Sequence, residues 1–125
     1  MNILLDSDIL IEILRSRDQV IQSQWNTLTN SHSDILFSPV TAAEVWAGAR
    51  PNEHQAISLF FRHLTCIAVE YKIGELAGEF LRQFSQSHNV KIGDALIAAT
   101  AVLHHATLWT RNRKHYPMPD VNFYN

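Results

Sequence analysis

Short apolar runs alternate along the chain with longer segments whose apolar residues recur at helical spacing. Buried strands typically have such runs, and strands that alternate with helices pair in parallel beneath helices on both faces. The sequence therefore predicts an α/β fold, a three-layer sandwich with a mainly parallel central sheet of four to five strands. The expected strands are residues 2–5, 34–38, 65–69 and 107–110, with 121–124 as a candidate fifth.

The helices expected between these strands differ in how far they are buried. Residues 73–84 give the clearest amphipathic pattern, with apolar residues on one face. The segment that begins at Asp94 is so apolar and so rich in alanine that it must be nearly engulfed. Further helices are expected from Ser7, over 18–29, from Pro39 to near Gly48, and from Pro51, the last with Ala56, Leu59, Phe60 and His63 along one face.

Length and composition predict one globular domain over residues 1–125. A chain of 125 residues with 46% apolar and 18% charged residues can build one core and is too short for two. Asp6 interrupts the first apolar run too early for a signal peptide, and no run approaches the length of a membrane span, so we expect a cytoplasmic protein without a membrane partner. The single Cys66 is expected to be a small buried side chain.

The charge balance excludes a protein that coats polyanions in general. The formal net charge is -2, whereas such proteins carry a large basic excess. A nucleic-acid role would therefore rest on a local patch, for which the candidates are Lys91, Arg111, Arg113 and Lys114. An ordinary solvated face is the alternative for this cluster.

Acidic residues follow the expected strands at positions where ligands bind in parallel sheets. Asp6 ends the first strand, Glu44 lies in the helix after the second, and Asp94 opens the alanine-rich helix. Carboxylates gathered in one cleft repel each other and take up protons unless a cation lies among them. Oxygen ligands suit Mg²⁺ or Mn²⁺, and the chemistry indicated is phosphodiester cleavage by a metal-activated water.

Each acid also has a purely structural interpretation. Asp6 or Ser7 would serve as the N-cap of the first helix. Glu44 would complete a capping box with Thr41, and Asp94 would be a first-turn acid favoured by the helix dipole. Taken singly, none of the three indicates a metal site.

Four segments taken together carry a family resemblance. The segments "LLDSDILIE", "SPVTAAEVWAGAR", "IGDALIAATA" and "LWTRNRKHY" stand in the order and at the approximate separations found in PIN-domain nucleases. The chain resembles a VapC-type toxin of that family from Met1 to about Pro119. The set of four is a specific signal, although its aspartate pair alone would be weak.

The resemblance implies a Mg²⁺- or Mn²⁺-dependent ribonuclease with a PIN-like fold and no other cofactor. Asp6 and Asp94 would hold the metal directly, and Glu44 would bind it through water or orient the attacking water. Asn112 stands where the family often has an aspartate and would act with Thr110 on the phosphate, so a second metal site would be weaker. Asp8 is expected to have a supporting role at best.

The resemblance also implies partners. Arg111, Arg113 and Lys114 would bind phosphates of the RNA substrate, so affinity should fall as salt rises. A VapB-like antitoxin is expected to block the acidic groove of a homodimer and to build a higher assembly with it. The aromatic-rich residues 57–64 and the neighbouring segment "VWAG" are candidate interface surfaces, and plain core is the alternative for the helix with Phe60 and Phe61.

Two other functions compete with this one. Haloacid-dehalogenase-like phosphatases use a strand-end pair such as Asp6 and Asp8 as nucleophile and acid, but the Gly-Thr that usually follows is absent here. The second alternative, prompted by Asn112, is a non-catalytic scaffold that binds an antitoxin and cuts nothing.

Overall fold

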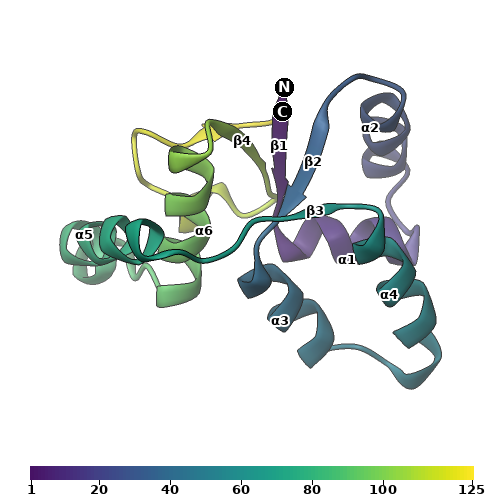
Figure 1. Ribbon diagram of the computed structural model, residues 1–125, viewed down its shortest axis with the longest axis horizontal. Coiled ribbons are helices and arrows are strands. Elements are labelled where there is room, and N and C mark those ends of the chain that lie inside the picture. The colour runs from purple at the N-terminus through teal and green to yellow at the C-terminus, as the bar shows by residue number, and fades with distance from the viewer.

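A central parallel sheet organises the computed structural model, which describes residues 1–125 (Figure 1). Its five strands are all parallel and lie in the order β3-β2-β1-β4-β5. The predicted α/β fold with four to five mainly parallel strands is therefore confirmed. The strands are β1 (Asn2–Leu5), β2 (Asp34–Phe37), β3 (Thr65–Cys66), β4 (Ala106–Trp109) and β5 (Asn122–Phe123).

Helices cover both faces of the sheet, as Figure 1 shows, with α5 and α6 on one side and α1 to α4 on the other. Two short 3₁₀ turns, η1 and η2, lie in the connections before α4 and after β4. The bounds are α1 (Ser7–Arg15), α2 (Gln19–Thr29), α3 (Pro39–Ala47), η1 (Pro51–Glu53), α4 (His54–Arg62), α5 (Tyr71–His88), α6 (Ile92–Leu103) and η2 (Arg113–His115).

The strand β1 shows why three layers form. Alternate side chains of a strand point to opposite faces, and here Ile3 and Leu5 join the core under α1 while Leu4 joins the core under α6. All three are fully buried. The alanine-rich α6 is engulfed as predicted, since Ala95, Ile97, Ala98, Ala99, Thr100 and Ala101 are all buried.

Three predictions of detail were wrong. The third strand ends at Cys66 rather than at residue 69. Cys66 was predicted to be buried, but it is exposed, as Thr65 is, in this two-residue strand at the edge of the sheet. In α4 the buried residue is Ile57, with Phe60 and Phe61 packed beside it, while Leu59 is 45% exposed. The bulky residues Ile57, Phe60 and Phe61 form an apolar stripe at helical spacing that outweighs the predicted face with its alanine and histidine.

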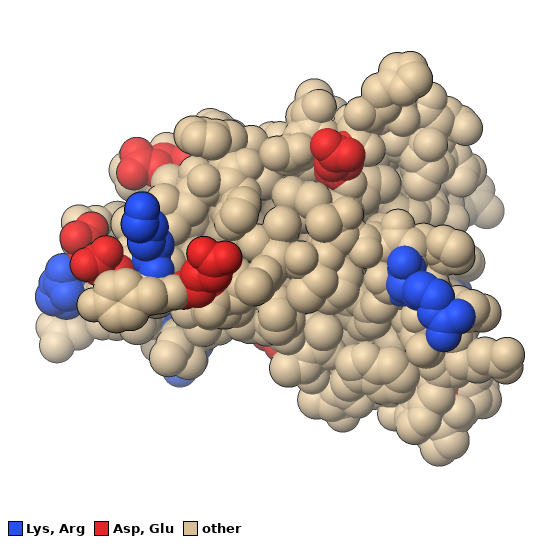
Figure 2. Space-filling model, viewed as in Figure 1, with Lys and Arg blue, Asp and Glu red and all other residues tan.

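The surface carries little concentrated charge on the face shown in Figure 2. Lys, Arg, Asp and Glu are few there, and most of them gather over the end of the molecule formed by α5. No helix in the structure combines the length and the apolar content that crossing a membrane requires.

Candidate active site

The carboxyl ends of β1 and β4 bring Asp6 beside Thr110. The backbone N–H of Asp6 donates to the carbonyl of Trp109 at 3.0 Å, which extends the pairing of the two strands by one residue. The Thr110 hydroxyl donates to Oδ2 of Asp6 at 2.8 Å, and the Tyr116 hydroxyl donates to the same oxygen at 2.7 Å. Asp6 is only 6% exposed, so a buried carboxylate is held in one orientation.

Asp6 is also the N-cap of α1. Its Oδ1 accepts a hydrogen bond from the backbone N–H of Ser7 at 2.8 Å. The structural interpretation of Asp6 is therefore correct, yet it accounts for one carboxylate oxygen only. The other oxygen faces the hydroxyl groups of the loop after β4.

Asp8 ties α1 to that same loop. Its Oδ1 accepts from the backbone N–H of Ile9 at 2.8 Å. Its Oδ2 accepts from the backbone N–H of Arg111 at 2.9 Å and from the side-chain amide of Asn112 at 3.1 Å. The predicted phosphate-positioning residue Asn112 is thus hydrogen-bonded to an acid that sequence analysis gave only a supporting role.

Glu44 does not form the capping box considered for it. The helix α3 begins at Pro39 and is capped by Ser38, whose hydroxyl accepts from the backbone N–H of Val40 at 3.1 Å. Thr41 instead donates its hydroxyl to the carbonyl of Leu5 at 3.4 Å. Glu44 therefore lies in the second turn of α3, free of a capping role.

The charge environment places Glu44 among the other acids. Burial raises the pKa of Glu44, and the negative charges of Asp6, Asp94 and Asp8 raise it further, against a hydrogen bond from the Ser7 side chain that lowers it. Burial and the charge of Asp6 likewise raise the pKa of Asp8. We call Asp6, Asp8, Glu44 and Asp94 the acidic edge.

Asp94 lies in the first turn of α6, where the helix dipole favours an acid. Its Oδ2 accepts from the backbone N–H of Lys91 at 3.3 Å, so the structural interpretation also holds. The ring Nδ1 of His115 lies 3.9 Å from its Oδ1. No Lys or Arg forms an ion pair with any member of the acidic edge.

The acidic edge carries more negative charge than the protein neutralises, and oxygen donors of this kind suit a hard divalent cation. As the side chains stand, no three Asp, Glu, His or Cys groups are placed to hold one metal ion. Both oxygens of Asp6 and both of Asp8 are held by protein donors.

The basic residues near this edge differ in whether their positive charges have partners within the protein. Arg111 lies 3.4 Å from the carboxylate of buried Glu12 and 3.8 Å from that of Asp18, so its charge is largely matched within the protein. The guanidinium of Arg113 lies 4.9 Å over the ring of Phe123. Lys114 forms no ion pair and lines two polar hollows, one with Thr110 to Arg113 and Asn125, the other with His88, Asn89, Lys91, Asp94 and His115.

Sequence analysis missed two residues of this region. Tyr116 is 3% exposed and reaches Asp6, and Glu12 is 4% exposed and accepts hydrogen bonds from Arg17 and Arg111. A signal for Glu12 was present, because it stands beside Ile9 and Ile13 on the buried side of α1. Tyr116 stands at the end of "RNRKHY", and no pattern in the sequence indicated that it contacts Asp6.

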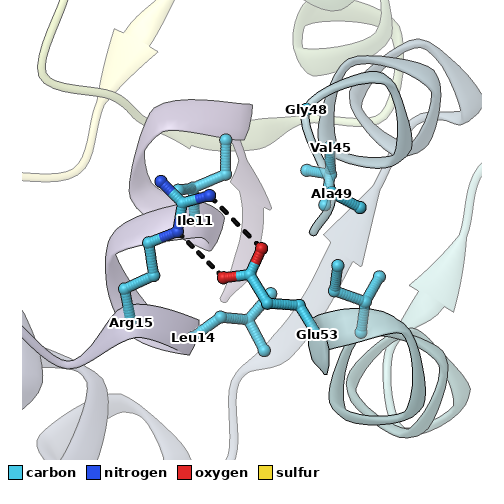
Figure 3. A pocket seen from close by; sticks show the side chains of 8 residues that line it. Ile11, Leu14, Arg15, Val45, Gly48, Ala49 and Glu53 are labelled. Carbon is cyan, nitrogen blue, oxygen red and sulfur yellow. Dashed lines mark hydrogen bonds and ion pairs between the residues drawn. The ribbon is translucent and has the colours of Figure 1, made fainter. Parts of the chain in front are cut away.

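A further hollow lies away from the acidic edge, between α1, α3 and the start of α4. Figure 3 shows its lining, which is mostly apolar, and the ion pair that spans it. Arg15 donates from Nε to Glu53 at 3.0 Å and from a terminal nitrogen at 3.3 Å. The two charged side chains that line this hollow, Arg15 and Glu53, are paired with each other, so the hollow offers no free acid or base for catalysis.

Comparisons with known proteins agree with the geometry. A family model described as PIN domain matches residues 3–121. Ribonuclease VapC10 of Mycobacterium tuberculosis is 33% identical over 117 residues, which covers 93% of this chain and 86% of the relative. Ribonuclease VapC19 of the same organism is 33% identical over 120 residues, which covers 94% of this chain and 95% of the relative.

Solved structures share the fold. VapBC2 from Rickettsia felis, bound to a DNA fragment from its promoter, aligns with a TM-score of 0.81 at 24% identity over 100% of this chain and 98% of that one. A toxin-antitoxin complex from Klebsiella pneumoniae aligns with a TM-score of 0.74 at 29% identity over 94% and 93%. Both alignments extend the likeness over nearly the whole chain.

Proposed function

The chain belongs to the PIN domain family, and on that premise we propose that it is an endoribonuclease toxin that a cognate antitoxin neutralises. Two relatives named as ribonucleases are 33% identical to it over more than nine-tenths of its length. The observation that carries the proposal is the acidic edge, whose carboxylates form no ion pair with a Lys or Arg. Such a cluster is costly for a fold and is explained by a bound cation.

The proposed cofactor is Mg²⁺, with Mn²⁺ as the alternative. Asp6 and Asp94 would hold the ion directly, and Glu44 would bind it through water or orient the attacking water. When bound, the ion supplies positive charge and lowers the pKa of a water molecule. The hydroxyls of Thr110 and Tyr116 fix the direction of the Asp6 carboxylate, since both donate to its Oδ2.

The proposed substrate is RNA. Thr110 and Asn112 would lie at the phosphate that is cut, because both belong to the loop bonded to Asp6 and Asp8. Arg113 and Lys114 form no ion pair within the protein and would bind flanking phosphates. Arg111 would do so only in part, since Glu12 and Asp18 share its charge. Binding is expected to weaken as salt rises.

The proposed partner is a VapB-like antitoxin. The Klebsiella pneumoniae structure, at 29% identity, is a toxin-antitoxin complex, which supports such a partner here. We expect one domain over residues 1–125 that forms a homodimer, assembles further with the antitoxin and works in the cytoplasm, where its RNA is found. Residues 57–64 stay a candidate interface, with Leu59 45% exposed.

The alternatives find less support. A phosphatase is disfavoured because the family model that matches residues 3–121 describes a PIN domain, and two relatives at 33% identity are named as ribonucleases. It would need Asp8 as an acid, whereas Asp8 accepts three hydrogen bonds as a carboxylate does. A non-catalytic scaffold would leave the unpaired charge of the acidic edge unexplained.

Asp6→Asn tests the proposal, with Asp34→Asn as the control at the opposite end of the sheet. Wild type and Asp34→Asn should arrest growth when expressed and should cut purified cellular RNA with Mg²⁺ but not with a chelator. Asp6→Asn should do neither while melting cooperatively. Equal toxicity and equal cleavage by all three proteins would reject the proposal.

A further inference from the structure

Asp8 and Asn112 form a contact that α1 capping does not explain. A first-turn acid stabilises its own helix, and the bond from the Ile9 N–H to Asp8 does this. The other two bonds come from Arg111 and Asn112, more than a hundred residues along the chain. The side chain of Asp8 therefore connects the helix after β1 with the loop after β4.

The loop after β4 is held by both aspartates of "DSD" in a connected chain of hydrogen bonds. The Asn112 N–H donates to the Thr110 hydroxyl at 3.0 Å, and that hydroxyl donates to Asp6 at 2.8 Å. The Asn112 side chain meanwhile donates to Asp8 at 3.1 Å. Asn112 thus fixes its loop against both acids at once. Its backbone N–H connects to Asp6 through Thr110, and its side-chain amide donates to Asp8.

We propose that Asp8 and Asn112 act as one unit, in which Asp8 supplies the fourth negative charge of the acidic edge and Asn112 holds that carboxylate in place. This inference rests on the proposed function and adds a residue to it. Asn112 is then a positioning residue rather than a metal ligand. Asp8 contributes its charge to the field felt by the metal, as it already does to the field felt by Glu44.

The identities of the two residues follow from this arrangement. An aspartate at 112 would lose the amide donor and place two carboxylates about 3 Å apart, which requires a proton or a cation between them. An asparagine at 8 would remove a charge and keep one acceptor oxygen, so it would lose either the bond from the Ile9 N–H or the bonds from Arg111 and Asn112. The pair carries one negative charge in the wild type, none in Asp8→Asn, two in Asn112→Asp and one again when the residues are exchanged.

Exchange of the two residues tests the inference without relying on cleavage. Mn²⁺ affinity would be measured by calorimetry on metal-free wild type, Asp8→Asn, Asn112→Asp and the double variant Asp8→Asn/Asn112→Asp, with Asp34→Asn as the matched control. Asp8→Asn should bind Mn²⁺ about 10- to 100-fold more weakly, the scale of residues that orient metal ligands. The double variant should recover near wild-type affinity.

Thermal melting without metal provides the second measurement. Asn112→Asp should melt below wild type because two carboxylates then oppose each other, and Mn²⁺ should restore its stability more than it raises that of the wild type. Wild-type Mn²⁺ affinity in Asp8→Asn, or a double variant no better than Asp8→Asn, would overturn the inference alone. A wild type that neither binds Mn²⁺ nor cuts RNA would overturn the proposed function together with it.

Discussion

Two groups of carboxylates in this small protein have opposite surroundings. Glu53 lies within reach of Arg15 across the apolar hollow of Figure 3, and this ion pair lowers the pKa of Glu53 to about 2. Glu44 lies among other acids at the end of the sheet, where burial and their charges raise its pKa. Glu53 is matched by an arginine as fold-stabilising acids commonly are, whereas Glu44 forms no ion pair with a Lys or Arg.

The same contrast runs within α1. Glu12 is buried, and hydrogen bonds from Arg17 lower its pKa, with Arg111 contributing as well. Asp8 lies one turn earlier on the same helix, and burial together with Asp6 raises its pKa. The position of a residue relative to the carboxyl ends of the strands, rather than its type, separates the acids that arginines pair with from the acids proposed for the active site.

The largest expected effect comes from Asp94→Asn. Removing one acid of the acidic edge should lower RNA cleavage about 100-fold or more, the scale found when a group that stabilises transition-state charge is lost. Glu53→Gln, which removes a carboxylate of the paired group, should cut RNA at the wild-type rate. The single-turnover rate at which each variant cleaves the same RNA measures the two effects. Similar losses in the two would erase the distinction between the groups.

The second largest effect should come from Tyr116→Phe. Burial and the charge of Asp6 raise the pKa of Tyr116, so its hydroxyl stays protonated and donates to Asp6. Without that bond the Asp6 carboxylate is held by Thr110 and Ser7 only, and we expect Mn²⁺ affinity and cleavage to fall about tenfold. The free energy of unfolding should fall by about 1 to 2 kcal/mol.

Tyr71→Phe is the matched control for this loss, because Tyr71 is 83% exposed. Chemical denaturation and calorimetry on the two variants separate stability from metal binding. If Tyr116→Phe lost stability but bound Mn²⁺ as well as Tyr71→Phe does, Tyr116 would belong with the structural residues.

The sequence predicted the fold because its signals are local. The run at Ile3 to Leu5 and the helical spacing of 73–84 each depend on neighbours in the chain, and both elements formed where expected. The length of the edge strand at Cys66 was harder to predict from the sequence, since it depends on how many residues of the neighbouring strand pair with it. Helix α4 shows the same limit, because two alternative faces were available and tertiary packing chose between them.

The candidate site was predictable only in part. Position relative to the expected strands and helices identified Asp6, Glu44 and Asp94 as candidates, and the order of the four motifs favoured them together as a proposed metal site. The links of Tyr116 to Asp6 and of Asn112 to Asp8 cross more than a hundred residues, so no spacing rule contains them. Likewise, Arg111 was predicted to bind phosphate without its ion pair to Glu12, because that partner lies on a different element.

A smaller effect on stability is expected from Glu53→Gln. The folded pKa of about 2 lies below the ordinary value of 4.5, so the ion pair stabilises the fold fully above pH 4.5 and is lost as pH falls to about 2. Glu53→Gln should therefore melt slightly below wild type at pH 7, and the two curves should converge in acid. Glu75→Gln, which changes an exposed residue of α5, should match wild type throughout.

The smallest effect, and the one with the opposite sign, should come from Glu44→Gln. Its raised pKa means that the folded state holds the proton more tightly than the unfolded chain does. The stability that protonation provides is thus present below pH 4.5 and lost as pH rises through the folded pKa. At pH 7 without metal, Glu44→Gln should be more stable than wild type, by no more than about 0.5 kcal/mol.

Metal should reverse that sign, which makes Glu44→Gln the sharpest test of the contrast between the two groups. A ligand that binds only the folded state stabilises it more the tighter it binds, so the same excess of Mn²⁺ should raise the melting temperature of the wild type more than that of Glu44→Gln. Mn²⁺ should raise the melting temperature of Glu53→Gln as much as that of the wild type, because the Glu53 carboxylate of the wild type is paired with Arg15. If Glu44→Gln were less stable than wild type even in a chelator, Glu44 would be a structural acid like Glu53.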